Sequence, residues 1–199
     1  MKILIACESS GVIRDAFRAK GHEAYSCDII DTGHEYHICD DVLNILDQNW
    51  DMMIAHPPCT YLASSGMHWT TRGFRDPQLT EDALEFVKKL MDAPIEKIVI
   101  ENPISIISTR IRKPDQYIQP YEFGEDASKK TSLWLKNLPA LKPTKYIEPR
   151  IIIKNGKEYK RWANQTDSGQ NKLTPSPDRW QERSKTYQGI AEAIVNQWG

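Results

Sequence analysis

The residues of this sequence best suited to covalent chemistry stand just after an apolar run from 52 to 55. That run reads as a buried strand, and His56-Pro57-Pro58 cannot continue it, because each proline fixes its own φ and lacks an amide donor. Cys59 therefore lies on a stiff loop beyond the carboxyl end of a strand, where open α/β sheets build their sites. This position predicts a nucleophilic thiol, although a buried cysteine on an ordinary loop is the alternative.

A second polar group, Glu101-Asn102-Pro103, ends the apolar run from 97 to 100. That run reads as the strand after the one that leads to Cys59. The two groups therefore stand at successive strand ends, and together they favour a catalytic site over an ordinary loop cysteine.

Three further carboxylates stand at predicted strand ends: Glu8, Asp28 and Asp41. In a Rossmann-like sheet, an acid after the second strand can accept ribose hydroxyls, and one after the third can accept an adenine amino group. Ser9 and Gly11 would let the backbone approach a cofactor. A strand-end aspartate can equally be a helix cap or a turn former.

The elements that must position these residues alternate along the chain. Apolar patterns predict strands at 2–6, 23–30, 52–55, 97–100 and 131–135, and helices near 12–20, 80–91 and 189–198, with Thr80 as a helix cap. Such alternation predicts an α/β fold: a Rossmann-like, mostly parallel twisted sheet with helices on both faces. Residues 31–38 and 63–78 read as loops.

The second half adds a basic hairpin. Asn155-Gly156 between strand-like runs predicts a β-hairpin within 151–162. We therefore expect a catalytic and cofactor-binding domain over 1–145, a hairpin and mobile loop over 146–178, and a C-terminal helical segment over 179–199. Trp180 and Trp198 read as packing residues.

Composition fits a soluble globular protein of one α/β domain, with 199 residues and a net charge of −1. The charge is uneven: residues 1–109 hold 9 Lys and Arg against 17 Asp and Glu, whereas residues 110–185 hold 17 against 9. That asymmetry hints at a polyanionic partner for the basic half. The apolar start is too short for a signal peptide or membrane span, so we expect a cytoplasmic protein.

The cysteines and histidines show no metal-site spacing, and we expect neither a metal nor a disulfide framework. Cys7, Cys27 and Cys39 read as small buried apolar residues.

The two polar groups resemble motifs of the DNA cytosine-5 methyltransferases. Residues 54–59, Ile-Ala-His-Pro-Pro-Cys, resemble the Pro-Cys nucleophile motif of that family, and residues 98–103, Ile-Val-Ile-Glu-Asn-Pro, resemble its Glu-Asn-Val motif, in the same order and at similar spacing. Almost the whole chain looks like small phage and prophage proteins identified as cytosine methyltransferases.

Other stretches resemble the cofactor motifs of this family. Residues 6–21 are similar to its first motif and helix, Asp28 to the ribose-binding acid and Asp41 to the adenine-contacting acid, and residues 187–190 are similar to the closing motif. The resemblance implies that S-adenosylmethionine is bound by Glu8, Ser9, Gly11, Asp28, Asp41 and Pro57. The chain departs from the family's Phe-x-Gly-x-Gly motif, with Cys7 and Ser9 where Phe and the first Gly belong.

The resemblance also implies a mechanism. The Cys59 thiolate adds to C6 of cytosine, which makes C5 nucleophilic toward a sulfonium methyl group. Glu101 holds or delivers a proton near N3, and Asn102 holds the loop that carries the nucleophile. A base then removes the C5 proton and Cys59 leaves.

The chain has no large target-recognition domain. Lys129 and Lys130 stand where the family has an Arg-x-Arg pair, and the surfaces left to bind DNA are the 63–78 segment and the basic segment 145–185. In the latter, cations alternate with Tyr159 and Trp162, which suits a nucleic-acid backbone and its bases. The cations of the hairpin are Arg150, Lys154, Lys157, Lys160 and Arg161. Solvated lysines that protect a sheet edge are the alternative.

Three functional hypotheses therefore stand. The first is cytosine-C5 methylation of DNA, single- or double-stranded. The second is the same chemistry on RNA or a free nucleotide, which the missing recognition domain permits. The third is a nucleic-acid-binding protein without turnover, which the altered glycine motif favours.

Overall fold

The structure, a computed structural model, describes residues 1–176 and 179–199, with only the backbone described for 179–181. The strands are β1 (Lys2–Ala6), β2 (Glu23–Asp28), β3 (His37–Cys39), β4 (Met52–Ala55), β5 (Lys97–Pro103), β6 (Gln116–Ile118), β7 (Thr131–Lys136), β8 (Arg150–Lys154) and β9 (Lys157–Arg161). The helices are α1 (Val12–Ala19), α2 (Met67–Thr71), α3 (Gln78–Met91), α4 (Ile107–Arg110), α5 (Arg179–Ser184) and α6 (Gln188–Trp198). Short 3-10 turns cover 42–44, 64–66 and 120–122.

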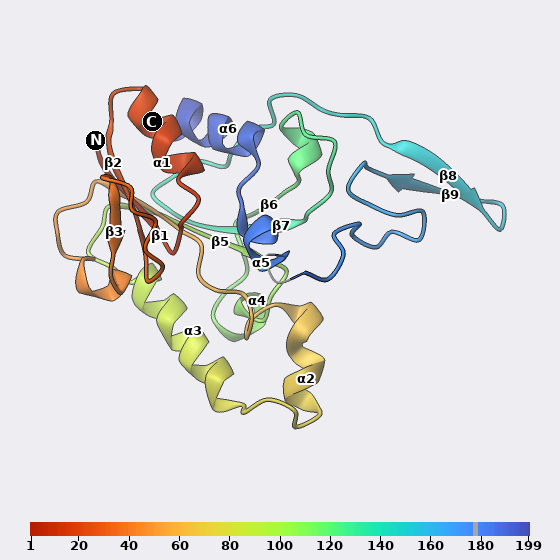
Figure 1. The fold of residues 1–199 in the computed structure, drawn as a ribbon, viewed down its shortest axis with the longest axis horizontal. Helices are drawn as coiled ribbons and strands as arrows, with labels where there is room; N and C mark the ends of the chain where they lie inside the picture. Colours follow the sequence, from red (N-terminus) through yellow and green to blue (C-terminus); the bar gives the residue numbers. More distant parts are fainter. Residues whose placement is uncertain (177–178) are drawn as a thin grey trace.

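Seven strands form one sheet in the order β3-β2-β1-β4-β5-β7-β6 (Figure 1). The first five of these run parallel, whereas β7 is antiparallel to both β5 and β6. The chain winds outward from β1 to β3 and then returns to β4 on the other side of β1, so the direction of winding reverses between β1 and β4. In open α/β sheets a ligand crevice forms outside the carboxyl ends of the strands at such a reversal.

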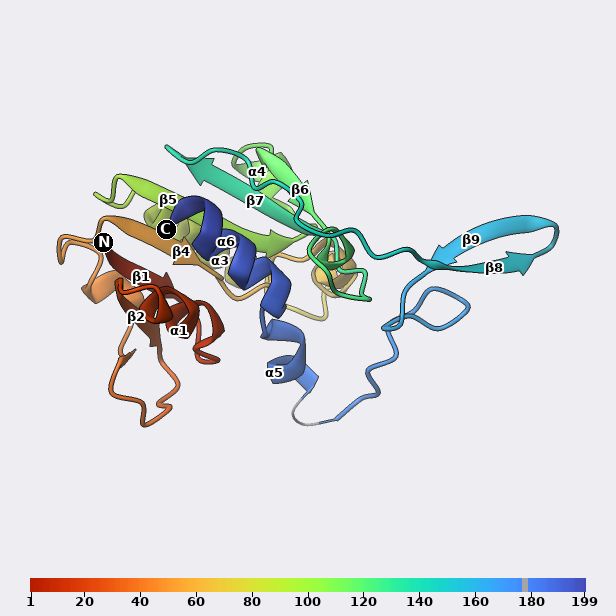
Figure 2. The same ribbon diagram turned by 90° about the horizontal axis from the view of Figure 1, so that it is seen from above.

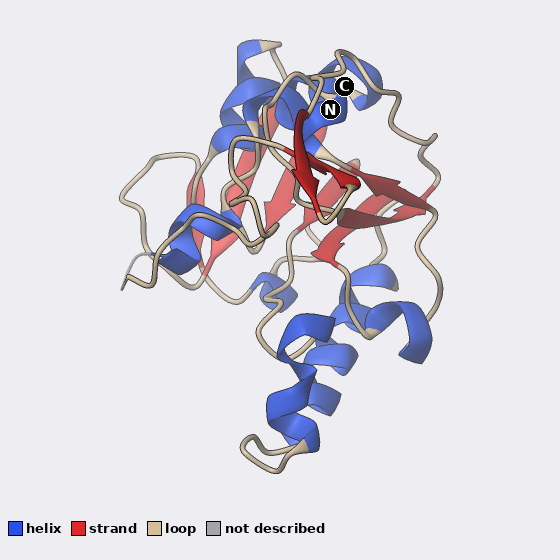
Figure 3. Ribbon diagram, turned by 90° about the vertical axis from the view of Figure 1, so that its right-hand side faces the viewer, coloured by secondary structure: helices blue, strands red, loops and turns tan. Residues whose placement is uncertain are grey.

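Helices cover both faces of this sheet (Figures 2 and 3). Alternate residues of a strand point to opposite faces, so in β1 Ile3 and Ile5 pack with α1 and α6, whereas Leu4 and Ala6 pack on the side of α3. All four are fully buried. The predicted fold class, a mostly parallel α/β sheet with helices on both faces and an added hairpin, is confirmed.

Several local predictions are wrong. The predicted loop at 31–38 ends too late: His37 and Ile38 form the edge strand β3 together with Cys39, because these three residues pair in parallel with β2. The predicted loop at 63–78 contains α2. Helix α3 begins two residues before Thr80, whose side chain is buried rather than capping. Strand β5 continues through Pro103, because its last residues pair with the antiparallel β7.

The hairpin β8–β9 projects from the body of the molecule (Figures 1 and 2). Its two-residue turn, Asn155-Gly156, has positive φ at both positions, 52° and 70°. Turns of this kind suit the twist of a hairpin and favour Asn-Gly, so the predicted hairpin is confirmed. Trp198 is buried as predicted, at 5% exposure. The prediction for the Trp180 side chain lies outside the described residues.

Candidate active site

The nucleophile and acid segments lie side by side at the carboxyl ends of β4 and β5. The two strands pair in parallel as far as Ala55 and Ile100. Beyond that pairing, the Asn102 side chain donates a hydrogen bond from Nδ2 to the carbonyl oxygen of Pro57 over 2.8 Å. Asn102 is only 1% exposed. The segment that carries Cys59 is thus tied to the end of β5, in the way expected of Asn102.

Glu101 has a neighbour, His56, that the sequence analysis did not pair with it. His56 Nδ1 lies 3.1 Å from Glu101 Oε2, and the side chains are 12% and 23% exposed. Burial acts to raise the pKa of Glu101. Hydrogen bonds with His56 and Thr131, together with the charges of Lys129 and His56, outweigh burial, so the pKa of Glu101 is lowered. The free protein therefore carries Glu101 as a carboxylate at neutral pH.

A small cavity of about 30 Å³ lies beside Glu101. This volume holds one or two water molecules. It is lined by Ile54, His56, Val99, Glu101, Ile118, Lys129, Thr131, Leu133, Ser184, Thr186, Tyr187, Ile190 and Ile194. The cavity thus contains the predicted acid but not Cys59, which is solvent-exposed. A ligand that meets both side chains must lie toward the loop that carries Cys59.

The two lysines that immediately precede β7 have different surroundings. Lys129 lines the cavity, and its Nζ donates to the Arg183 carbonyl over 2.8 Å. Lys130 instead places its Nζ 4.3 Å from the centre of the Tyr117 ring. Of the pair, Lys129 is the one placed to act on a group held by Glu101.

The predicted cofactor residues gather at the carboxyl end of β1. Glu8 is 7% exposed; its Oε1 accepts a hydrogen bond from Ser10, and its Oε2 is buried with no partner among the described residues. Gly11, the N-cap residue just before α1, has a φ of +75°, and a side chain there would collide with the guanidinium of Arg14. The first turn is therefore compact, with one carboxylate oxygen left for a donor.

Asp28 and Asp41 flank the same turn. Burial, followed by the charges of Asp28, Cys27 and Asp41, raises the pKa of the Cys7 thiol, which shows that both carboxylates lie near Cys7. Asp28 accepts a hydrogen bond from Ile30 N over 3.0 Å, and Asp41 caps the turn at 42–44 through Leu43 N, also over 3.0 Å. Both aspartates therefore act as the turn former and cap that the sequence left as the alternative, and each carboxylate keeps a second oxygen that can bind a ligand.

The other cysteines differ in exposure. Cys27 is buried as predicted, and burial raises its pKa to about 12. Cys39 is exposed, so its prediction as a buried residue is wrong, because β3 is an edge strand that leaves this side chain in solvent. All four cysteines are free.

The predicted nucleic-acid residues of the hairpin do not share one surface. The cross-strand pairs put Lys154, Lys157 and Arg161 on one face and Lys160 on the other. Trp162 is not available to stack on a base: it is 7% exposed, and its ring stacks on Tyr121 at 4.1 Å between centroids. That part of the prediction is wrong, because Trp162 fastens the hairpin to the body.

Two contacts of Glu101 were missed by the sequence analysis. His56 was interpreted as a loop residue that can touch the site, without a contact to Glu101, and Thr131 was only part of the segment that follows Lys130. A single histidine before two prolines belongs to no residue pattern that would indicate a contact with Glu101. The role of Thr131 depends on the antiparallel pairing of β7 with β5, in which Thr131 lies opposite Pro103.

No protein-family model matches this chain, and no curated protein sequence matches it. Among solved structures, one match is an E. coli protein described as a DNA modification methyltransferase encoded within a prophage. The two chains are 12% identical with a TM-score of 0.44, and the match covers 67% of this chain. It spans less than half, 45%, of the other chain.

In the part of the chain that the structure describes, no helix has both the length and the apolar character that crossing a bilayer requires. The same residues contain no cluster of three or more His, Cys, Asp or Glu side chains able to hold a metal ion.

Proposed function

We propose that this protein transfers a methyl group to C5 of cytosine in DNA, with Cys59 as nucleophile and Glu101 as the carboxyl group that exchanges a proton with N3 of the base. The observation that carries the proposal is the buried hydrogen bond from Asn102 to Pro57, which joins the two segments at the ends of adjacent strands. Two motif segments that resemble those of one enzyme family are thereby held as one unit.

The chemistry assigned to these side chains is as follows. As the Cys59 thiolate bonds to C6, the conjugated electrons of the ring shift toward N3, which takes up a proton relayed through Glu101 from His56. The enamine-like C5 then becomes the nucleophile. Once C5 carries its methyl group, N3 returns its proton to Glu101. A base then removes the C5 proton, and the electrons of that bond re-form the C5–C6 double bond as the bond between sulfur and C6 breaks, which restores the ring and the thiolate.

His56 and Lys129 support the role of Glu101. The lowered pKa of Glu101 means that the carboxylate meets the substrate without a proton. His56, in contact with that carboxylate, is a partner that can supply or hold the proton, and Lys129 contributes positive charge where negative charge develops on the ring. Because the cavity beside Glu101 is small, the target base would lie between it and the Cys59 loop.

S-adenosylmethionine supplies an electrophilic methyl group when bound. The turn after β1 fits this cofactor, since the unpartnered and buried Glu8 Oε2 can accept hydrogen bonds from an ammonium group. Asp28 would accept the ribose hydroxyls and Asp41 the adenine amino group. Ser9, Gly11 and Pro57 would form the wall along the backbone.

Methyl transfer tests the proposal. The full chain is incubated with DNA and the cofactor, and the digested nucleosides are analysed for 5-methylcytosine by mass spectrometry. Cys59→Ser should abolish the product, whereas Cys39→Ser, which alters another exposed thiol, should not. Product on RNA or a free cytidine nucleotide and none on DNA would replace the proposed substrate. Cofactor binding without product on any substrate would favour the binding-protein alternative.

A further inference from the structure

The hairpin β8–β9 has two chemically different faces, which its pairing register defines. Across the ladder, Arg150 lies opposite Arg161, Ile152 opposite Tyr159, and Lys154 opposite Lys157. Paired residues lie on the same face, and the face changes at each step along a strand. We call the face made by these six residues the cationic face.

The opposite face is less charged. It carries Ile151 opposite Lys160 and Ile153 opposite Glu158. The two isoleucines are 48% and 73% exposed. Four of the five cations of the hairpin therefore lie on the cationic face, and the fifth, Lys160, lies beside an acid and two apolar side chains.

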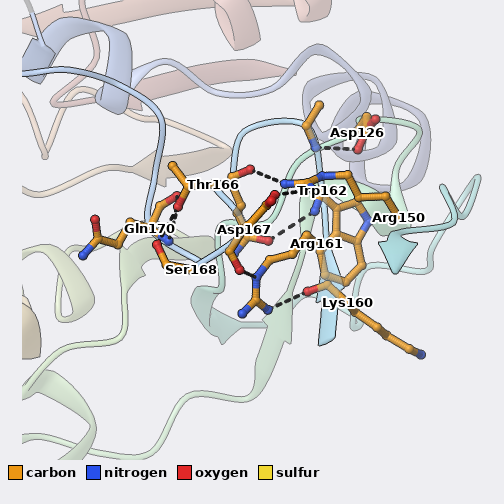
Figure 4. Close-up of polar contacts among 11 residues, drawn as sticks. Asp126, Arg150, Lys160, Arg161, Trp162, Thr166, Asp167, Ser168 and Gln170 are labelled. Carbon is orange, nitrogen blue, oxygen red and sulfur yellow. Dashed lines mark hydrogen bonds and ion pairs between the residues drawn. The ribbon is translucent and has the colours of Figure 1, made fainter. Parts of the chain in front are cut away.

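The cationic face is fixed at its base and open at its tip. Arg150 pairs with Asp167 at 2.6 Å, and Arg161 Nε donates to the carbonyl of the same residue over 3.2 Å, as Figure 4 shows. Lys154 and Lys157, on either side of the turn, form no ion pair within the described part of the chain. Tyr159 lies between the base and the tip of the hairpin and is 37% exposed, and the Arg161 guanidinium lies 5.3 Å from the centre of its ring.

The strand ends hold the hairpin in a set position. Trp162 stacks on Tyr121 and donates from Nε1 to the Ile147 carbonyl over 3.2 Å. Ala163 N donates to Asp126 over 2.8 Å (Figure 4). The base of the hairpin is therefore packed against the body of the molecule, which contains the candidate active site, rather than attached through a free linker.

The same junction reaches the cavity beside Glu101. Asn164 exchanges two hydrogen bonds with the backbone of Ser128, at 2.9 and 3.0 Å, and also contacts the Tyr187 side chain. Ser128 precedes Lys129, and both Lys129 and Tyr187 line that cavity. One residue thus connects the base of the hairpin to two walls of the candidate active site.

We propose that the cationic face binds the phosphate backbone of duplex DNA and presents that duplex to the candidate active site. A projecting two-stranded ribbon is narrow enough to enter a major groove, and Lys154 and Lys157 at its tip can reach the phosphates. The inference deepens the proposed function, on which it rests for the identity of the polymer.

Salt dependence of DNA binding tests this assignment. Each phosphate contact on a duplex contributes about 0.9 to the slope of log K against log salt concentration. Lys157→Gln should lower the slope by about 0.9 and weaken binding up to roughly eightfold at 0.1 M salt. The double variant, with Lys154→Gln and Lys157→Gln, should lower the slope by about 1.8 and weaken binding up to roughly 60-fold at 0.1 M salt. Fluorescence anisotropy of a labelled duplex with the full chain measures both.

Lys160→Gln is the matched control, because it removes the same charge from the same strand on the other face. The proposal predicts an unchanged slope for this variant. Equal effects of Lys157→Gln and Lys160→Gln, no effect of either, or an effect confined to single-stranded DNA would each overturn it. Since binding is measured without cofactor and does not need Cys59, its failure is distinguishable from a failure of methyl transfer.

Discussion

Replacing Asn102 by alanine removes the side chain that joins the two motif segments. The bond to the Pro57 carbonyl is fully buried, so the carbonyl loses its donor, which costs about 1–3 kcal/mol. The Asn102 Oδ1 atom, however, is itself buried without a partner, and its removal recovers part of that cost. We therefore expect the free energy of unfolding to fall by about 1–2 kcal/mol.

Urea unfolding measures this loss. With a slope of about 2 kcal/mol per molar, the midpoint should fall by roughly 0.5–1 M. Methyl transfer to DNA should fall further than the folded fraction does, by up to about a hundredfold, because a loop misplaced by about 1 Å forfeits alignment of the nucleophile.

The matched control is Asn196→Ala on α6, which removes an exposed hydrogen bond that Asn196 accepts from Lys20 at the end of α1. It should change the free energy of unfolding by less than about 0.5 kcal/mol and leave activity unchanged. If Asn102→Ala matches this control in both stability and activity, the Asn102 side chain does not position the Cys59 loop.

The remaining predictions concern the acid, the cofactor turn and the packing of α6. His56→Gln should raise the pKa of Glu101, which infrared titration of the carboxyl group measures. The stability that the ionised Glu101 contributes is present above its unfolded pKa of about 4.5 and is lost as pH falls through the folded pKa. The variant should therefore lose less stability than the parent protein between pH 5.5 and 3. Glu8→Gln should weaken binding of S-adenosylmethionine about 10- to 150-fold in calorimetry, since a charged acceptor contributes about 1.5–3 kcal/mol. Gly189→Ala should lower the free energy of unfolding by about 1–3 kcal/mol, because the added carbon would overlap the Phe123 carbonyl oxygen.

Each of these has a control in the same chain. His68→Gln alters an exposed histidine and should leave the Glu101 titration in place. Glu23→Gln, at the exposed start of β2, should bind the cofactor as the parent protein does. Gly66→Ala adds a carbon that meets its neighbours at 3.6 Å or more, an ordinary contact, and should be tolerated. A variant indistinguishable from its control would contradict the corresponding assignment.

The order of the main elements was predictable because the apolar runs are short and their ends are marked. Proline and glycine stop β4 and the helix α1 in the sequence itself, so the position of Cys59 after a strand followed directly. The end of β5 did not follow, because the residues beyond Ile100 are polar. Their extended conformation comes from pairing with β7, a partner about thirty residues away.

The candidate site was predictable in part for the same reason. Asn102 and Pro57 could be expected to meet, since strand order brings their segments together. The contact of Glu101 with His56 and Lys129 could not, because it depends on side-chain packing across three elements. Trp162 reads in the sequence as one more ring among cations, and only the contact with Tyr121 reveals it as an anchor. The alternation of faces along β9 likewise needed the observed register.

Covalent trapping on a fluorinated base shows whether Cys59 is the nucleophile. The full chain is incubated with S-adenosylmethionine and DNA containing 5-fluorocytosine, whose C5 fluorine blocks the final elimination, and the linked residue is identified by mass spectrometry of the peptides. We expect a protein–DNA adduct on Cys59 that persists in Cys39→Ser and disappears in Cys59→Ser. An adduct that forms in Cys59→Ser, or no adduct from a protein that binds both DNA and cofactor, would contradict it.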